Sequence, residues 1–232
     1  MALPELKYCT VCGGHRFSFK EVLWPELVNE WQLSPYEVDY VNHQQGFVCD
    51  QCGNNLRAMA LAYAILRSYR YAGILEDFVK SDVGDRLKVL EINNAGALSP
   101  VLSRVGGHKL ITYPEYDMED LDIDSSLYDL VVHSDTLEHI KNPLQALSEC
   151  KRVLKPDGRC IFTVPVIVDR LSRSRAGLDD SFHGNNTTDL EDLVVRTEFG
   201  CDIWKYVMHA GFTTVTLHCI DYPAGLAIEA NL

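Results

Sequence analysis

The chain of 232 residues lacks any apolar run that approaches the ~20 residues needed to cross a bilayer. Its first ten residues, MALPELKYCT, lack the basic start and apolar core of a secretory signal peptide. Positive charge is scarce, because 21 lysines and arginines face 33 aspartates and glutamates and the net charge is −12. Such a surface repels a phosphate backbone and disfavours nonspecific nucleic-acid binding. We therefore expect a cytoplasmic protein whose partners include neither a membrane nor a nucleic acid.

Four of the eight cysteines form two CxxC pairs, Cys9 with Cys12 and Cys49 with Cys52, and a glycine follows each pair. In an intracellular chain such pairs indicate metal binding or free thiols more often than disulfides. The two-residue spacing lets both sulfurs of a pair reach one ion, and the glycine lets the backbone turn tightly around it. We predict a structural zinc ion held by these four cysteines, in a zinc-ribbon-like segment over residues 1–56. A redox pair or unrelated thiols is the alternative.

The sequence before residue 87 favours helices. Apolar residues recur at helical spacing in several stretches, and Ser34, Pro35 and Glu37 have the pattern of a capping box. A helical insert between the cysteine pairs would serve packing or substrate recognition, and packing is favoured. The predicted helices cover residues 21–33, 34–42, 54–72 and 74–80.

From residue 87 onwards, strand and helix patterns alternate, which favours a mostly parallel sheet with helices on both faces. The last two predicted strands are separated by only five residues, which suits an antiparallel hairpin. The sequence thus predicts an α/β fold, a Rossmann-like doubly wound sheet over residues 57–232 closed by that hairpin. The predicted strands are 87–92, 109–113, 128–133, 159–164, 213–220 and 226–231, and the predicted helices are 97–105, 143–154 and 189–210.

The stretch LKVLEINNAGAL, residues 87–98, has the layout of a nucleotide-binding strand, loop and helix. In such units the backbone amides at the helix start face the ligand. The glycines that usually stand at alternate positions of the loop are replaced here by Asn93, Ala95 and Ala97, and Gly96 is the only glycine. Asparagine tolerates a positive φ, and alanine is small, so the loop can still approach a ligand. The motif is weak when taken alone.

Residues 128–165, YDLVVHSDTLEHIKNPLQALSECKRVLKPDGRCIFTVP, closely resemble class I S-adenosylmethionine-dependent methyltransferases of the type 11-like group. In that family a strand, a short loop containing LEH, a helix, a KPGG-like turn and a strand ending in VP follow in this order. The resemblance covers roughly residues 86–232, and the cysteine-bearing front end resembles bacterial members with a zinc-ribbon-like segment. It implies the fold, S-adenosylmethionine as cofactor, and methyl transfer. It does not imply the acceptor, because acceptors differ widely within the family.

The resemblance implies a cofactor site along the ends of the strands. In this family the acid that ends the first strand supports the methionine part of the cofactor, a place that Glu91 occupies, and the next loop passes beneath that part. Residues at the end of the strand over 128–133 would flank the sulfonium and the acceptor. The implied contacts on these elements are Glu91, Asn93, Ala95, Gly96, His133 and Ser134.

The resemblance also implies an acid for the ribose hydroxyls, which is Glu115, or alternatively Asp117. Asp117, Met118 and Leu121 would border the adenine, although a solvated acidic loop would explain the same residues. The family usually places a helix and a third strand between the ribose acid and this DxxxL motif. Here the motif begins two residues after Glu115, so we predict a reduced sheet without that helix and strand.

Methyl transfer from a sulfonium is an in-line displacement that needs no covalent nucleophile, and no Ser-His-Asp or Cys-His arrangement is apparent. His139 and His183 are candidates for a general base, although the LEH pair is often architectural. Arg170, Arg173 and Arg175 stand in a polar stretch and could grip an anionic group on the acceptor. A solvated loop is the alternative for that stretch.

We therefore predict methyl transfer to a small-molecule or carrier-linked acceptor. The competing interpretation is a non-catalytic binding or scaffold protein that keeps the methyltransferase fold with a degenerate cofactor loop. The glycine-poor loop favours this alternative, whereas Glu91 and Glu115 oppose it. A zinc-ribbon nucleic-acid binder is disfavoured by the negative charge. The sequence does not predict an oligomeric state.

Overall fold

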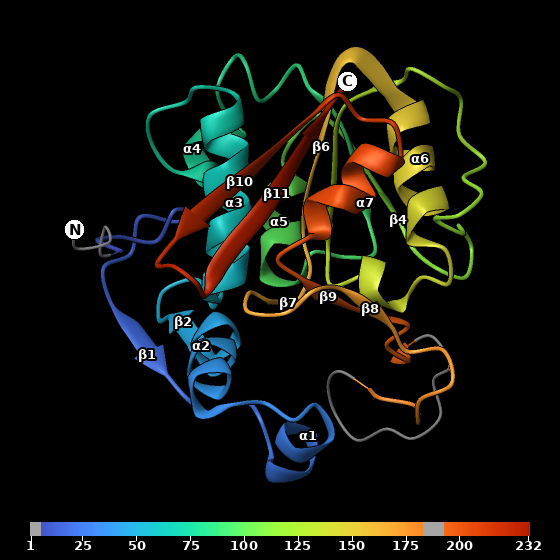
Figure 1. Ribbon diagram of the computed structural model, residues 1–232. Helices are drawn as coiled ribbons and strands as arrows, with labels where there is room; N and C mark the ends of the chain where they lie inside the picture. Colours follow the sequence, from blue (N-terminus) through green and yellow to red (C-terminus); the bar gives the residue numbers. More distant parts are fainter. Residues whose placement is uncertain (1–5, 183–192) are drawn as a thin grey trace.

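A six-stranded sheet forms the centre of the computed structural model, which describes residues 6–182 and 193–232 (Figure 1). The strand order is β10-β11-β6-β5-β3-β4. Strands β4, β3, β5 and β6 run parallel to one another, whereas β11 is antiparallel to both β6 and β10. The predicted mostly parallel α/β sheet and its closing hairpin are therefore present. The strands are β3 (Lys88–Ile92), β4 (Gly107–Ile111), β5 (Tyr128–Ser134), β6 (Leu154–Thr163), β10 (Thr214–Ile220) and β11 (Gly225–Asn231).

Two hydrophobic clusters cover the two faces of this sheet. Helix α3 (Leu56–Ser68) packs on one face, and α6 (Pro143–Val153) and α7 (Ile203–His209) pack on the other. Along β5 the side chains alternate as a strand requires, so that Leu130 and Val132 join the first cluster and Val131 joins the second. None of the helices in the described part of the chain has the length and apolar character needed to cross a membrane.

The connection from β4 to β5 confirms the reduced sheet. Residues 112–127 are all described and contain no helix or strand element, so β4 is the last strand on this side. Two residues of α6 hold the connection instead. Arg152 donates hydrogen bonds to the carbonyl oxygens of Leu121 and Ile123 at 2.8 and 2.7 Å, and Glu149 accepts one from the amide of Leu121 at 2.9 Å. Arg152 and Glu149 are themselves 2.7 Å apart.

The cysteine-bearing segment contains a two-stranded antiparallel sheet of β1 (Phe17–Phe19) and β2 (Phe47–Cys49), with α1 (Pro25–Glu30) and α2 (Pro35–Gly46) between them. The predicted capping box of α2 is confirmed by both of its hydrogen bonds. The helix predicted over 21–33 is shorter, because Pro25 takes the first helical position and the residue before a proline is held extended. The predicted boundary between the zinc-ribbon-like segment and the second domain, at residues 56 and 57, stays a prediction. One buried cluster extends across it and contains both Cys9 and Leu61.

Other predicted helices also end up shorter. After α3 comes α4 (Leu75–Phe78), and the helix predicted over 97–105 is a 3-10 turn, η1 (Gly96–Leu98), followed by α5 (Ser99–Leu102). The strand predicted over 109–113 is β4, which begins and ends two residues earlier. This shift matters for the site, because it moves Glu115 away from the end of the strand.

The helix predicted over 189–210 is wrong for residues 193–202, and residues 189–192 lie outside the described part of the chain. Strand β9 (Thr197–Gly200) pairs with β7 (Val166–Ile167) and β8 (Arg173–Ser174) in a small three-stranded sheet. Helix α7 takes up only the end of the predicted range. β-Branched and aromatic residues at 194–199 favour a strand, and a Cβ at Gly200 would lie only 2.1 Å from the carbonyl oxygen of Arg170.

An ion pair joins α2 to the segment after β7. Arg170 donates from Nε and Nη2 to the two carboxylate oxygens of Glu37, at 2.6 and 2.8 Å. The same guanidinium donates to the carbonyl oxygens of Trp31 and Gln32. The hydrogen bonds from Arg170 outweigh the effect of burial and lower the pKa of Glu37 to about 2.

Because the pKa of Glu37 rises to its ordinary value of 4.5 on unfolding, the pair stabilises the protein above that pH, and this contribution is lost as the pH falls towards 2. We expect Glu37→Gln to lower the free energy of unfolding by about 2–3 kcal/mol at pH 7. The difference from wild type should shrink steadily below pH 4.5. Urea unfolding across this range measures it, with exposed Glu26→Gln as the control. A difference that does not depend on pH would contradict the assignment.

Candidate functional site

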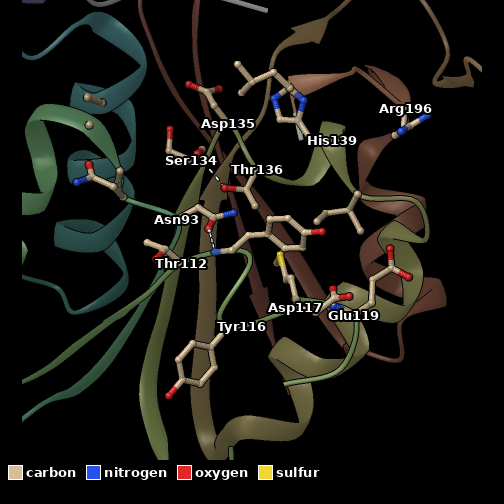
Figure 2. Close-up of a pocket in the computed structure, with 18 of the residues that line it drawn as sticks. Asn93, Thr112, Tyr116, Asp117, Glu119, Ser134, Asp135, Thr136, His139 and Arg196 are labelled. Atoms are coloured by element: carbon tan, nitrogen blue, oxygen red, sulfur yellow. Dashed lines mark hydrogen bonds between the residues drawn. The ribbon is translucent and has the colours of Figure 1, made fainter. Parts of the chain in front are cut away.

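A cavity of about 730 Å³ lies at the carboxyl ends of the parallel strands (Figure 2). Its walls include residues 93–97 after β3, residues after β4 between 112 and 119, and residues 134–136 at the end of β5. Gly53, Asn55 and Ala58 contribute from the start of α3. Ligands of open α/β sheets bind at this edge, and the volume is in the usual range for small-molecule sites.

This cavity brings together seven of the predicted site residues. They come from three separate segments of the chain, each of which follows a parallel strand. Figure 2 shows His139 on the upper side of the cavity and Asp117 on the lower right. The seven residues are Asn93, Ala95, Gly96, Asp117, Met118, Ser134 and His139.

The loop after β3 adopts the backbone that its sequence allows. Asn93 has φ +51°, and its side-chain oxygen accepts a hydrogen bond from the amide of Tyr113 at 3.0 Å. Gly96 has φ +62°, and no atom lies within 4 Å of the position where a Cβ would stand. Asparagine and glycine are the residues that tolerate this left-handed conformation best. Two of the four loop positions therefore meet a backbone requirement, even though the loop lacks the usual glycines.

Glu91 lies beneath the loop and does not line the cavity. Its carboxylate is fully buried, accepts a hydrogen bond from the amide of Ala95 at 2.7 Å and lies 2.7 Å from Nε2 of His108. Burial alone would raise the pKa of Glu91, but hydrogen bonds with His108, Ala95 and Ser99 outweigh it and lower the pKa. Glu91 therefore fixes the loop from below. Sequence reasoning missed His108, because its contact with Glu91 depends on the register between β3 and β4.

Three further predicted contacts do not line the cavity. Glu115 is exposed, and Leu121 is buried with its amide bonded to Glu149. His133 is completely buried and stacks on Phe162 with ring centroids 4.6 Å apart. Tyr113 and Tyr116 line the cavity near the place where Glu115 was expected, because β4 ends at Ile111. The candidate base His183 lies outside the described residues.

A buried arginine also contacts the cavity wall. Arg57 on α3 is 1% exposed, and its guanidinium contacts the carboxylate of Asp135, which lines the cavity. Burial lowers the pKa of Arg57 to about 10, so the side chain stays charged at neutral pH. Asp135 has φ +50°, an uncommon backbone for this residue type. Only the position of an arginine within an otherwise apolar helical stripe could have indicated Arg57 from the sequence.

The imidazole of His139 is held by two contacts. Its Nδ1 lies 3.2 Å from the carbonyl oxygen of Val194, and its Nε2 lies 3.7 Å from the carboxylate of Glu138. The carbonyl oxygen of Glu138 accepts a hydrogen bond from the amide of Arg196, a residue that also lines the cavity. The turn that carries His139 is thus joined to the segment before β9. These contacts orient the ring at the cavity wall.

The three arginines that were expected to grip an anionic acceptor are engaged elsewhere. Arg170 pairs with Glu37, and both Arg173 and Arg175 pair with Glu198. None of the three lines the cavity. Carboxylates of the chain itself neutralise these arginines, so their positions give no support to the expected grip on an anionic acceptor.

The four cysteines of the CxxC pairs form one cluster, and their sulfur atoms all lie within 4.8 Å of one another. The sulfurs of Cys9 and Cys52 are 3.6 Å apart, and those of Cys12 and Cys49 are 3.7 Å apart. These separations are far longer than a disulfide bond of about 2.0 Å. They agree with the value of about 3.8 Å that tetrahedral ligation with zinc–sulfur bonds of about 2.3 Å would give. The donor set therefore fits a closed tetrahedral metal site.

The backbone around the cluster has the turns that the sequence predicts. Gly13 and Gly53 have φ +78° and +73°, and their amides donate to the carbonyl oxygens of Cys9 and Cys49. Burial raises the pKa of Cys12 to about 11 and that of Cys9 further. For Cys52 burial acts in the same direction, but hydrogen bonds led by Asn54 lower the pKa. Burial therefore disfavours the thiolate forms of Cys9 and Cys12 unless a cation lies beside them.

Comparisons with known proteins find one family and several similar proteins. Residues 82–162, about a third of the chain, match a family described as a methyltransferase domain. A curated relative, malonyl-[acyl-carrier protein] O-methyltransferase of Laribacter hongkongensis (strain HLHK9), is 32% identical over 92 residues. That match covers 38% of this chain and 31% of the relative, so the chain spans about a third of the relative's length.

Two solved structures are similar at low identity. The CMeT domain of the citrinin polyketide synthase is 13% identical, with 88% of this chain and 59% of that chain covered and a TM-score of 0.48. An S-adenosylmethionine-dependent methyltransferase from Aquifex aeolicus is 14% identical, with 62% and 80% covered and a TM-score of 0.38. Both TM-scores lie below 0.5, so neither similarity carries an argument about this chain.

The position of His133 predicts an effect of pH on stability. Burial, opposed by the charge of Glu138, lowers the pKa of His133 to about 3, whereas the ordinary value of 6.5 returns on unfolding. The unfolded chain therefore binds a proton that the folded chain rejects, and the protein loses stability as the pH falls below 6.5. Relative to wild type, His133→Leu should gain about 2 kcal/mol between pH 7 and pH 5 in urea unfolding.

The control for this prediction is the same substitution at His209, which is exposed at the end of α7. His133→Leu should also leave the affinity for a ligand of the cavity unchanged, since the ring does not line it. An equal effect of the two substitutions at pH 5, or a lost ligand affinity, would contradict the position of His133.

Proposed function

We propose that this chain is an S-adenosylmethionine-dependent methyltransferase that acts on a small-molecule or carrier-linked acceptor. The observation that carries the proposal is the cavity at the ends of β3, β4 and β5, because its walls come from the strand–loop–helix unit that the sequence assigns to the cofactor. The match of residues 82–162 to a methyltransferase domain covers the same unit.

The residues present fit this cofactor in two ways. The open space above Gly96 lets a ligand approach the backbone of the loop, where a side chain would otherwise stand. Asp117 and Met118, on the wall after β4, are the proposed contacts of the adenine. Tyr113, which precedes them in the sequence, lines the same cavity. Glu115 is exposed, so its proposed bonds to the ribose would require a change in the segment after β4.

When bound, the cofactor would supply the methyl group for transfer. The work of the chain is then to align the acceptor, exclude water and, for some acceptors, remove one proton. Ser134, Asp135 and Thr136 lie at the carboxyl end of β5 and are the proposed neighbours of the acceptor. Asp135 is fixed by Arg57, so it would accept a hydrogen bond from an N–H or O–H group. His139 is the remaining candidate for a base within the described residues, and its two contacts favour a positioning role.

The relative's acceptor is a malonyl group on an acyl-carrier protein, and this supports a carrier-linked acceptor as one of the two options. The paired arginines give no support to an anionic acceptor. We also propose that the four cysteines hold one zinc ion. With four thiolates it would be a structural site, since no ligand position stays open for substrate.

The proposal predicts that the purified protein binds S-adenosylhomocysteine, as measured by isothermal titration calorimetry. Gly96→Leu should weaken this binding by at least ~10-fold, because the new side chain would stand in the space above the loop. The matched control is Gly177→Leu. Gly177 also has a positive φ, +84°, and open surroundings, but it does not line the cavity. No binding to wild type at millimolar ligand would favour the non-catalytic alternative.

The zinc proposal predicts about one equivalent of zinc per chain in metal analysis of the purified protein. Cys12→Ser should remove most of the metal and lower the stability, because three thiolates close the site less well than four. The control is Cys201→Ser, which changes an exposed cysteine outside the cluster. A wild-type protein with less than half an equivalent after careful handling would contradict the proposal.

A further inference from the structure

One buried side chain joins the cysteine cluster to the loop of the cavity. Asn54 is 1% exposed, and its Nδ2 donates to the sulfur of Cys52 at 3.4 Å and to the carbonyl oxygen of Ala97 at 3.3 Å. Cys52 is one of the four clustered thiols, and Ala97 lines the cavity. A single amide group therefore bonds a predicted metal ligand and the predicted cofactor loop at the same time.

The main chain around Asn54 also contacts both the cysteine cluster and the cavity wall. The carbonyl oxygen of Asn54 accepts a hydrogen bond from the amide of Cys49 at 2.9 Å. Its two neighbours, Gly53 and Asn55, both line the cavity. Asn55 also begins α3 by accepting a hydrogen bond from the amide of Ala58 at 2.9 Å. The segment from Cys52 to Asn55 is thus bonded to the cysteine cluster at one end and to α3 at the other.

The chemistry of the link requires an amide. The NH2 group of asparagine offers two hydrogens, one for the sulfur and one for the carbonyl oxygen. An aspartate of the same shape offers only acceptors and would repel both groups, and a leucine would offer neither. At 1% exposure, water cannot take over either hydrogen bond.

We propose that Asn54 is a positioning residue that couples metal binding at the cysteine cluster to ligand binding in the cavity. A bound metal ion fixes the sulfur of Cys52, Asn54 connects this sulfur to Ala97, and Ala97 belongs to the loop beneath the ligand. The inference rests on the proposed function, because it takes both a metal at the four thiols and a nucleoside ligand in the cavity. Such coupling acts equally in both directions.

The first test uses the full chain loaded with Co²⁺, whose absorption reports on thiolate ligands. Addition of S-adenosylhomocysteine should shift the sulfur-to-cobalt charge-transfer band of wild type, because the ligand moves Ala97 and with it the bond from Asn54 to Cys52. The shift should be absent in Asn54→Leu and in Asn54→Asp. The control is Thr10→Val, which removes a buried hydrogen bond of 2.6 Å from the cluster segment to Met59 on α3 and leaves Ala97 untouched.

The second test measures zinc affinity by competition with a chelator, with and without saturating S-adenosylhomocysteine. We expect the ligand to tighten zinc binding about 5- to 10-fold in wild type and in Thr10→Val. In Asn54→Leu the two zinc affinities should agree. A structural role alone would weaken zinc binding in this variant but would leave the effect of the ligand intact.

The outcomes separate the two proposals. If wild type does not bind S-adenosylhomocysteine, the proposed function fails, and the coupling fails with it. If wild type binds S-adenosylhomocysteine but no metal, only the zinc site and the coupling fail. If wild type binds both, and Asn54→Leu keeps the band shift and the affinity ratio of wild type, only the coupling through Asn54 is overturned. If Asn54→Leu does not fold, the same comparison with Asn54→Asp and Thr10→Val decides the question.

Discussion

The buried carboxylate of Glu91 is the contact on which the geometry of the cavity depends. It bonds the amide of Ala95 above it and contacts His108 on the neighbouring strand, so it joins the loop to the sheet. An isolated carboxylate at this depth would be very unfavourable, and hydrogen bonds with Ala95, His108 and Ser99 offset the loss of water. With the loop fixed in this way, Asn93 and Gly96 can hold left-handed backbones that open its surface to a ligand.

The fold could largely be predicted from the sequence, because it follows from local periodicity. The buried strands, the capping box at Ser34, the short hairpin before β11 and the missing strand after Glu115 were all visible as spacing. The CxxC pairs likewise fixed which thiols would meet. Patterns of this kind report contacts between near neighbours, or between groups whose chemistry admits few partners.

What the sequence could not provide are contacts that depend on register and on tertiary packing. Glu115 follows a strand in the sequence, but β4 ends two residues early, and two tyrosines occupy the wall instead. Arg170, Arg173 and Arg175 looked like an anion site because their acidic partners lie 23 or more residues away. Arg57 and Asp135 are 78 residues apart, so no local pattern could pair them.

The shortened sheet has a consequence for local motion in the connection from β4 to β5. Where a further strand would give a ladder of backbone hydrogen bonds, the chain from Leu121 to Ile123 is attached to α6 through the side chains of Arg152 and Glu149. A segment held by two side chains opens locally at lower free energy than a strand inside a sheet. Amide hydrogen exchange in this connection would therefore be faster than in the neighbouring strands of the sheet.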